Sequence, residues 1–301
     1  MHVGMIGLGR MGANMSLRLI RGGHQVTGFD PSDSARSKFV AEGGLAAASL
    51  AELAAALGSP RIFWLMVPAG KPVDDTIEAL LPLMVKGDII IDGGNSNYKD
   101  TMRRAANLAS AGFHFVDSGT SGGVWGIEEG YSLMIGGDEE IVAGLSPIFK
   151  TLAPAADKGW GRVGPAGAGH FVKMVHNGIE YGMMQSFAEG LSIIQHKSDF
   201  QLDTHQIAEI WRYGSVVRSW LLDLIARALE ENPTLQGIAP YVDDSGEGRW
   251  TAAEAIDLNV PAPIITLSLI ERIRSREEDS FGDRLLSAMR NQFGGHAIKK
   301  D

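Results

Sequence analysis

Four polar residues recur at helical spacing in the middle of the chain. Lys173, His176, Asn177 and Glu180 stand at i, i+3, i+4 and i+7, which places all four on one stripe of a helix. Apolar residues occupy its other faces: Phe171, Val172, Met174, Val175, Ile179 and Met183. A lysine and a glutamate facing one pocket can act as an acid and base pair, because burial and neighbours tune their proton affinity. The alternative, a solvated Lys–Glu face, is disfavoured by the apolar flanks.

A glycine-rich turn near the N-terminus has the pattern of a nucleotide-binding loop. Gly7, Gly9 and Gly12 form G-x-G-x-x-G directly after an apolar strand and before a helix. The first glycine allows a tight turn, the second lets a pyrophosphate approach the backbone, and the third lets the helix pack closely. A plain glycine-rich turn is the alternative. We expect cofactor contacts from the whole loop, with the phosphates on the helix N-terminus: Gly7, Leu8, Gly9, Arg10, Met11 and Gly12.

Asp30 indicates which dinucleotide is preferred. It closes the second strand about 20 positions after the glycines, where a carboxylate accepts hydrogen bonds from the adenosine ribose and repels a 2′-phosphate. The nearby cations, Arg10, Arg36 and Lys38, are not at the strand end. We therefore expect NAD, with NADP as the alternative cofactor. A second role for Asp30 is to cap the helix that follows Pro31.

Three further strand ends carry candidate binding residues, because ligands bind outside the carboxyl ends of parallel strands. Leu65-Met66-Val67-Pro68 and Asp92-Gly93-Gly94-Asn95-Ser96 end two strands, and we expect Met66, Val67 and Asn95 at the cofactor. Helix capping is the alternative for Asn95. Ser121-Gly122-Gly123 ends another strand. Its two glycines permit a concave run of backbone N–H groups that can hold a carboxylate, or else a flexible turn.

The elements that must position these residues divide the chain in two. Apolar runs alternate with helical patterns up to about Gly164, which predicts parallel crossover units. The expected strands are Val3–Ile6, Gln25–Phe29, Ile62–Val67, Ile89–Ile91, Phe113–Val116, Leu133–Ile135 and Trp160–Val163. After Gly164 only helical patterns follow, the first a long one over residues 170–196. We predict an α/β Rossmann-type doubly wound sheet over residues 1–164. A smaller all-α domain over residues 165–301 would supply the catalytic residues.

Composition excludes several classes of protein. The chain has 301 residues, a net charge of −9 and no cysteine. The absence of cysteine rules out disulfides, thiolate nucleophiles and Cys-ligated metals, and it fits a reducing compartment, so we expect the cytoplasm. A negative charge disfavours nucleic acid and anionic lipid as partners. No apolar run approaches a membrane span, and no basic segment precedes the apolar start, so we expect neither a span nor a signal peptide.

Together these motifs resemble the decarboxylating 6-phosphogluconate dehydrogenases in their short form, within the β-hydroxyacid dehydrogenase superfamily. The superfamily shares the glycine loop, the Ser-Gly-Gly turn and the lysine, whereas Glu180 and an Arg…Phe-Gly-x-His tail are typical of the 6-phosphogluconate enzymes. The resemblance covers nearly the whole chain and is carried by five stretches: Gly7–Gly12, Asp92–Ser96, Ser121–Gly123, Lys173–Tyr181 and Arg290–His296.

The resemblance implies a mechanism without a metal. Lys173 would act as general base in oxidation of the 3-hydroxyl, and Glu180 as general acid that protonates the enediol left by loss of CO₂. The product would be ribulose 5-phosphate. The implied substrate contacts are Asn95, Ser121, Gly122, Gly123, His176 and Asn177 around the carboxylate and hydroxyls, Tyr181, Arg272 and Arg290 at the phosphate, and His296 nearby. Arg290 and His296 would come from a neighbouring subunit, which implies a homo-oligomer, dimer or tetramer.

One stretch departs from the family pattern. Where the longer enzymes carry Lys-Gly-Thr-Gly-Lys, this chain has Ser245-Gly246-Glu247-Gly248-Arg249. An anionic Glu247 would repel a phosphate, so phosphate recognition must rest on the arginines or be weaker.

Two alternatives remain open. The first is a β-hydroxyacid dehydrogenase of the 3-hydroxyisobutyrate type that retains CO₂, and the second is a non-catalytic nucleotide sensor. Only the decarboxylating enzyme needs an acid at Glu180, and a sensor needs neither Lys173 nor Glu180.

Overall fold

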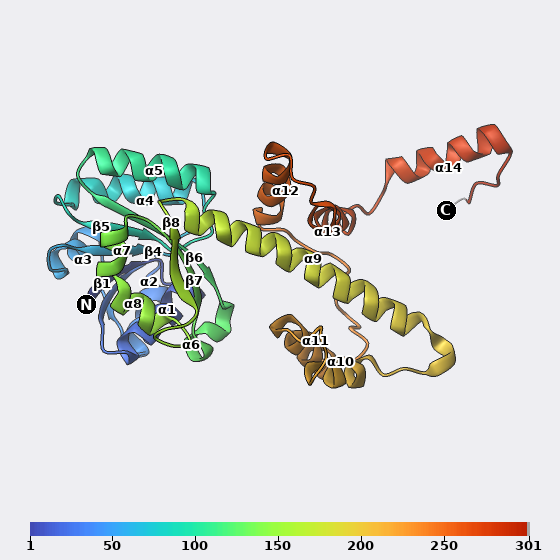
Figure 1. Ribbon diagram of the computed structural model, residues 1–301, viewed down its shortest axis with the longest axis horizontal. Helices are drawn as coiled ribbons and strands as arrows, with labels where there is room; N and C mark the ends of the chain where they lie inside the picture. Colours follow the sequence, from blue (N-terminus) through green and yellow to red (C-terminus); the bar gives the residue numbers. More distant parts are fainter. Residues whose placement is uncertain (300–301) are drawn as a thin grey trace. The chain divides into compact units, whose positions relative to one another are not determined.

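The computed structural model describes residues 1–299 and divides into two compact units, Met1–Asn177 and Gly178–Asp301. Figure 1 shows a sheet with helices in the first unit and helices in the second. The sequence pattern placed a boundary at Gly164, before the long helix. In the structure the division falls within that helix, after Asn177, so its first turns pack with the sheet.

The first unit is built on an eight-stranded sheet with the order β3-β2-β1-β4-β5-β6-β7-β8. The order reverses at β1, which lies between β2 and β4, and such a reversal is where open α/β sheets bind ligands. The predicted doubly wound α/β fold is therefore confirmed. The strands are β1 (His2–Ile6), β2 (Gln25–Phe29), β3 (Leu45–Ala46), β4 (Ile62–Leu65), β5 (Ile89–Asp92), β6 (His114–Ser121), β7 (Ser132–Gly136) and β8 (Trp160–Gly164).

The pair β6 and β7 is antiparallel, and here the prediction of parallel crossovers throughout was wrong. Only residues 122–131 join the two strands, including the short helices η2 (Gly123–Trp125) and α6 (Gly126–Glu129). A parallel connection needs a dozen or more residues. The strand β6 also runs to Ser121, five residues beyond its predicted end, because β7 pairs with this extension.

Helices cover both faces of the sheet, because alternate strand residues point to opposite sides. On β4, Ile62 and Trp64 pack with one core cluster, whereas Phe63 and Leu65 pack with the other. The first cluster includes side chains of α1 (Arg10–Arg21), α2 (Asp33–Ala41), α7 (Glu139–Gly144) and α8 (Ser146–Leu152). The second includes side chains of α3 (Leu50–Ala56), α4 (Lys71–Leu80) and α5 (Tyr98–Ser110).

Helices make up the second unit in the part of the chain that the structure describes. They are the later turns of α9 (Ala168–His196), then α10 (Thr204–Arg212), α11 (Trp220–Glu231), α12 (Glu247–Asp257), α13 (Pro263–Arg274) and α14 (Phe281–Gly294). A small apolar core of α10 and α11, centred on Ala208 and Leu222, packs against Phe187 and Leu191 of α9. Among residues 1–299, none of the helices combines the length and the apolar character needed to cross a membrane.

A single arginine of α1 binds two other segments of the first unit. Arg18 donates from its guanidinium to five backbone carbonyl oxygens, at 2.8–3.1 Å. Two of them lie in α6, and three lie at the end of α8 and just beyond it: Ile127, Glu128, Thr151, Leu152 and Ala153. The helix that begins at the glycine loop is therefore tied to the segment that follows the Ser-Gly-Gly turn.

Replacing Arg18→Met should lower the free energy of unfolding by about 2 kcal/mol, because partly buried carbonyl groups lose a charged donor. Arg21 supplies the control: its ion pair with Glu128 leaves the two side chains 57% and 70% exposed, so Arg21→Met should change stability by less than about 1 kcal/mol. Urea unfolding followed by circular dichroism measures both. Equal losses in the two variants would contradict the role assigned to Arg18.

Candidate active site

The three glycines of the loop differ in what surrounds them. Gly7 has φ +97°, and a Cβ placed on it would lie 2.4 Å from the carbonyl oxygen of Met66. A Cβ on Gly12 would lie 1.9 Å from the carbonyl oxygen of Gly7. A Cβ on Gly9 would meet no atom within 4 Å. The fold therefore requires the first and third glycines, whereas the second borders open space of the kind a pyrophosphate needs.

A pocket of about 740 Å³ lies at the carboxyl ends of β1, β2, β4 and β5. Gly9 is the N-cap of α1 and has no side chain that could bind the first N–H groups of the helix, which suits them to a phosphate. Most predicted cofactor residues line this pocket: Gly7, Gly9, Arg10, Met11, Gly12, Asp30, Met66, Val67 and Asn95. Leu8 is the exception, since its side chain is in the core and its N–H donates to Asp30.

Asp30 does not cap the following helix, because Ser32 does so by accepting from the N–H of Ala35. The Asp30 carboxylate accepts from the N–H groups of Leu8 and Ser32, both at 2.8 Å. Asp30 lines the pocket, and its carboxylate keeps capacity to accept from ribose hydroxyls. Arg36 was predicted away from the strand end, and that was wrong: its guanidinium donates to the Asp30 carbonyl oxygen.

Asn95 lies in a tight turn between β5 and α5. The N-cap of α5 is Asn97, whose side chain accepts a hydrogen bond from the N–H of Lys99. Asp92 folds the turn by accepting from the Gly94 N–H at 3.1 Å and from the Ser96 hydroxyl at 2.7 Å. The capping alternative for Asn95 is therefore excluded.

A buried arginine of α5 lies behind this turn. The Arg104 guanidinium is 3.9 Å from the Asp92 carboxylate and donates to Asp74 at 2.8 and 3.0 Å. These hydrogen bonds hold the pKa of Asp74 below its ordinary value. The guanidinium of Arg104 therefore places a fixed positive charge next to the turn that contains Asn95.

Three members of the polar seam meet near the start of α9. Lys173 is 6% exposed, and its Nζ donates to the Asn177 Oδ1 at 2.6 Å. The His176 Nδ1 lies 3.3 Å from that Nζ, and its Nε2 lies 3.5 Å from the Ser121 hydroxyl. The solvated alternative is excluded for Lys173 by its burial. Glu180 is half-buried on the same helix, two turns further along.

The strand end that leads into the Ser-Gly-Gly turn lies between the dinucleotide pocket and the polar cluster around Lys173. Thr120 lines the dinucleotide pocket, and the next residue, Ser121, contacts His176. Gly122 and Gly123 then adopt φ +134° and +52°, which other residues rarely do. The turn is therefore built for glycine at both positions. Sequence reasoning missed Thr120, because it lies on the part of β6 beyond the predicted end.

The second unit brings together two of the residues predicted at a phosphate. The Arg272 guanidinium lies 3.4 Å from the centroid of the Tyr181 ring, a cation–π contact. The Ser245 N–H donates to the Tyr181 hydroxyl at 3.4 Å. Glu247 is 3% exposed at the start of α12 and accepts from the Ser245 hydroxyl. The carboxylate of Glu247 is therefore hydrogen-bonded to Ser245, in the loop that precedes α12.

The last two predicted substrate residues lie at the end of the described chain. Arg290 is on α14 and His296 follows that helix, and both are exposed. The carbonyl oxygen of His296 accepts from the Asn291 side chain at 2.9 Å. Their roles stay predictions. Across residues 1–299 no group of three or more His, Asp or Glu side chains is placed to hold a metal ion.

Comparison with known proteins identifies relatives of both units. Residues 2–161 match the NAD binding domain of 6-phosphogluconate dehydrogenase, and residues 169–283 match the 6-phosphogluconate dehydrogenase C-terminal domain. A Haloferax volcanii protein, named as an NAD-dependent, decarboxylating 6-phosphogluconate dehydrogenase, is 41% identical over 301 residues, covering 100% of this chain and 99% of its own length.

Solved structures extend the comparison. Plasmodium falciparum 6-phosphogluconate dehydrogenase, described with NADP⁺ and with its substrate, superimposes with a TM-score of 0.84 at 28% identity, and this chain spans 66% of its length. Mycobacterium tuberculosis 3-hydroxyisobutyrate dehydrogenase has a TM-score of 0.71 at 23% identity, covering 89% of this chain and 90% of its own. The second likeness concerns the fold alone.

The open space at Gly9 yields a test of the dinucleotide pocket. Gly9→Ala should fold with unchanged stability yet weaken NAD binding about tenfold or more, because its methyl group fills space needed by the pyrophosphate. Gly144→Ala is the control, since a Cβ there also meets nothing within 4 Å and Gly144 ends α7. Isothermal calorimetry measures the binding constants. Undiminished NAD affinity in Gly9→Ala would place the pyrophosphate elsewhere.

Proposed function

This chain belongs to the 6-phosphogluconate dehydrogenase family, and from that premise we propose that it converts 6-phosphogluconate to ribulose 5-phosphate and CO₂ with reduction of NAD(P). The observation that carries the proposal is the burial of the Lys173 amine among His176, Asn177 and, through His176, Ser121. A lysine buried in a polar cluster beside a dinucleotide-binding strand end fits a general base rather than a solvated charge.

The cofactor pocket fits a dinucleotide with NAD preferred. Gly9 leaves the space for the pyrophosphate, and Asp30 is aimed to accept from ribose hydroxyls. Met66, Val67 and Asn95 line the part of the pocket formed by β4 and β5. NAD bound there supplies the hydride acceptor for C3 of the substrate. Arg36 beside Asp30 leaves NADP as an alternative, because a cation near the strand end can approach a 2′-phosphate.

Lys173 is assigned the first proton transfer. In its amine form it takes the proton of the 3-hydroxyl as C3 is oxidised, and the product is a 3-keto acid. Asn177 and His176 fix the direction of the amine through the contacts at 2.6 and 3.3 Å. The carboxylate β to the new carbonyl then leaves as CO₂, and the ammonium of Lys173 returns its proton to the carbonyl oxygen, which becomes a hydroxyl of the enediol.

Glu180 is assigned the second proton transfer. It donates a proton to C1 of the enediol while the adjacent enediol hydroxyl gives its proton back to Lys173, which leaves the carbonyl of ribulose 5-phosphate. The helix α9 carries both groups, so their separation is set by two turns of one element. An enzyme of the 3-hydroxyisobutyrate type keeps its carboxylate and needs no such acid, and Glu180 therefore favours the decarboxylating reaction.

Substrate contacts follow from the same placement. Ser121 and the N–H groups of Gly122 and Gly123, with His176 and Asn177, are assigned to the carboxylate and hydroxyls. Arg272 is assigned to the phosphate, held in place by the Tyr181 ring. Glu247 is buried and accepts from the Ser245 hydroxyl, so recognition of the phosphate is assigned to the arginines.

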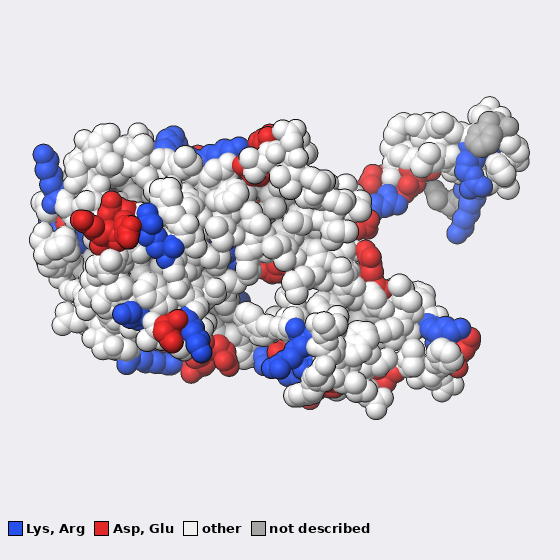
Figure 2. Space-filling model, in the orientation of Figure 1, with Lys and Arg blue, Asp and Glu red and all other residues white. Residues whose placement is uncertain are grey.

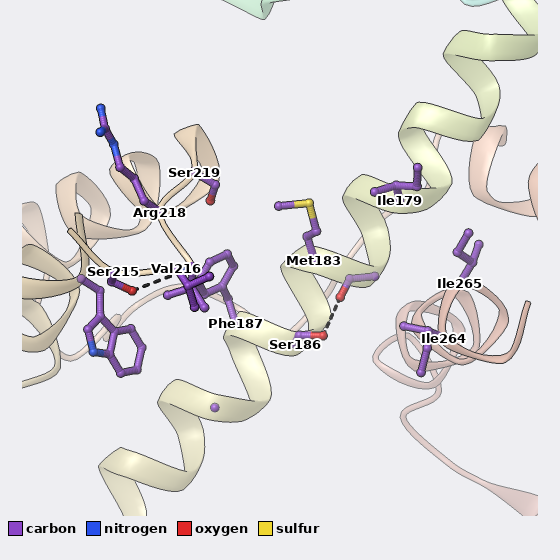
Figure 3. Close-up of a pocket in the computed structure, with 14 residues that line it drawn as sticks. Ile179, Met183, Ser186, Phe187, Ser215, Val216, Arg218, Ser219, Ile264 and Ile265 are labelled. Atoms are coloured by element: carbon purple, nitrogen blue, oxygen red, sulfur yellow. Dashed lines mark hydrogen bonds between the residues drawn. The ribbon is translucent and has the colours of Figure 1, made fainter. Parts of the chain in front are cut away.

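We assign the chain to a homo-oligomer, dimer or tetramer, with Arg290 and His296 reaching a neighbouring subunit. Figure 2 shows wide areas of the surface without charged side chains. The helices α13 and α14 expose large apolar residues, among them Phe281, which is 70% exposed, and Ile264. A groove of about 830 Å³ lies between α9, the loop at Val216 and the start of α13. Figure 3 shows apolar side chains of these segments lining it. Apolar surface of this extent favours association. The cytoplasmic location stays a prediction.

The direct assay supplies purified protein with 6-phosphogluconate and either cofactor. NADH should form faster than NADPH, together with equal amounts of CO₂ and ribulose 5-phosphate, because every oxidised molecule loses its carboxylate. Enzymatic assay of the pentulose phosphate checks the product. The absence of NAD(P)H and of product would end the proposal, and NADH without CO₂ would favour the non-decarboxylating alternative.

Substitution of the two assigned groups separates their roles. Lys173→Ala should abolish NADH formation, a loss of about 10² to 10⁴ in kcat, which is the range for removal of a general base. Glu180→Gln should slow formation of ribulose 5-phosphate while NAD still binds. Lys150→Ala and Glu189→Gln, both exposed, are the controls and should turn over normally. Stopped-flow and steady-state rates give the comparison, and near-normal turnover in either test variant contradicts its role.

Cofactor choice should depend on the carboxylate of Asp30. Asp30→Asn removes the charge that repels a 2′-phosphate, so the ratio of kcat/KM for NAD to that for NADP should fall about tenfold or more, a change of about 1.4 kcal/mol. Asp157→Asn is the control, because Asp157 is exposed and does not line the pocket. A cofactor ratio that Asp30→Asn leaves unchanged would confine Asp30 to a structural role.

A further inference from the structure

Alternate residues of β6 contact successive turns of α9. Asp117, Gly119 and Ser121 share one face of the strand, because strand side chains alternate. Asp117 binds the first turn of the helix, Gly119 lies against Lys173, and Ser121 contacts His176. The strand therefore contacts the helix at intervals along its first turns. All of these residues belong to the first compact unit.

Asp117 provides a cap that the helix itself lacks. Gly167 precedes α9 and has no side chain to bind the first N–H groups. The fully buried carboxylate of Asp117 instead accepts from the Gly167 N–H at 2.7 Å and the His170 N–H at 2.8 Å. Both oxygens are thus committed to the helix start, where the helix dipole favours a negative charge. Two bonds of this kind fix the helix both along its axis and in rotation.

Gly119 sets how closely the helix approaches the strand. A Cβ on Gly119 would lie 2.4 Å from the Lys173 Cβ and 2.7 Å from the Gly169 carbonyl oxygen. A Cβ on Gly169 would lie 2.4 Å from the Met134 carbonyl oxygen of β7. The backbones of α9 and of the strands β6 and β7 are therefore in direct contact where the helix crosses the sheet, and the Lys173 Cβ lies against β6. Any side chain at position 119 must move Lys173.

We propose that Asp117 and Gly119 are positioning residues for Lys173: Asp117 fixes the axial position and rotation of α9, and Gly119 fixes its distance from the strand that carries the Ser-Gly-Gly turn. The inference rests on the general-base role proposed for Lys173. It goes further in assigning the placement of the amine to two buried residues that do not line the dinucleotide pocket. A proton transfer is sensitive to such placement, since misalignment by about 1 Å can cost about a hundredfold in rate.

The test compares Gly119→Ala and Asp117→Asn with matched controls. The oxygen of an amide at position 117 can accept from one of the two N–H groups, but its NH₂ group then faces the other N–H and cannot accept from it. Gly161→Ala is the control for the first variant, because a Cβ on this β8 residue meets no atom within 4 Å. Asp138→Asn is the control for the second, because Asp138 caps the unrelated helix α7. We expect kcat with 6-phosphogluconate to fall about a hundredfold in both test variants, with the Kd for NAD and the behaviour of both controls unchanged.

A second measurement is independent of activity. Acetylation of Lys173 by acetic anhydride, followed by peptide mass spectrometry, should be slow in the native protein and faster in both variants, relative to the exposed Lys150 in the same sample. A native protein inactive on 6-phosphogluconate would refute the proposed function, while the acetylation rates still decide the positioning. If Gly119→Ala does not fold, the isosteric Asp117→Asn decides. Unchanged kcat and unchanged Lys173 reactivity in the folded variants, or a loss confined to NAD binding, would overturn the inference.

Discussion

The structure depends on one constraint: the amine of Lys173 must stay inside the protein beside a strand end that also borders the dinucleotide pocket. A buried amine needs hydrogen-bond acceptors, and Asn177 and His176 supply them from the next turn of the same helix. The helix in turn needs a fixed start, which β6 provides through Asp117 and Gly119. Thr120 and Ser121 then turn one strand end toward the cofactor pocket and toward His176.

This constraint explains why the compact units divide after Asn177 rather than after β8. The first turns of α9 belong to the sheet, because the contacts that hold them come from β6 and β7. The later turns, which carry Tyr181, belong with the helices that carry Glu247 and Arg272. Lys173 and its neighbours are therefore in the same compact unit as the predicted dinucleotide pocket, whereas Tyr181, Arg272 and Arg290, which are assigned to the phosphate, lie in the other.

Local features of the site could be predicted from the sequence, since they depend on neighbours in the chain. The G-x-G-x-x-G turn, the strand end at Asp30 and the polar seam of α9 are set by spacing and periodicity alone. Capping was harder to assign, because Asn95 and Asn97 are both suited to it, and only the helix start shows that Asn97 is the cap.

What could not be predicted depends on contacts between distant segments. The antiparallel pairing of β7 carries β6 to Ser121, through Asp117 and Gly119, whose residue types have low strand propensity on their own. In the sequence Asp117 is an acidic residue at the end of a predicted strand, and its hydrogen bonds to the start of α9 become evident only in the folded chain. Arg36 and Asp30 are close in the chain, yet their contact requires the turn of α2. The burial of Glu247 likewise depends on a loop that folds onto Tyr181.

Chemical rescue tests the general-base role of Lys173 most directly, because it measures whether an added amine restores the activity that is lost with the Lys173 side chain. Lys173→Ala is supplied with 6-phosphogluconate, NAD and increasing concentrations of methylamine or ethylamine. If Lys173 is the base, NADH formation should rise in proportion to the concentration of unprotonated amine, and the larger trimethylamine should have no effect. An inactive variant that binds both ligands and that no small amine restores would contradict the account.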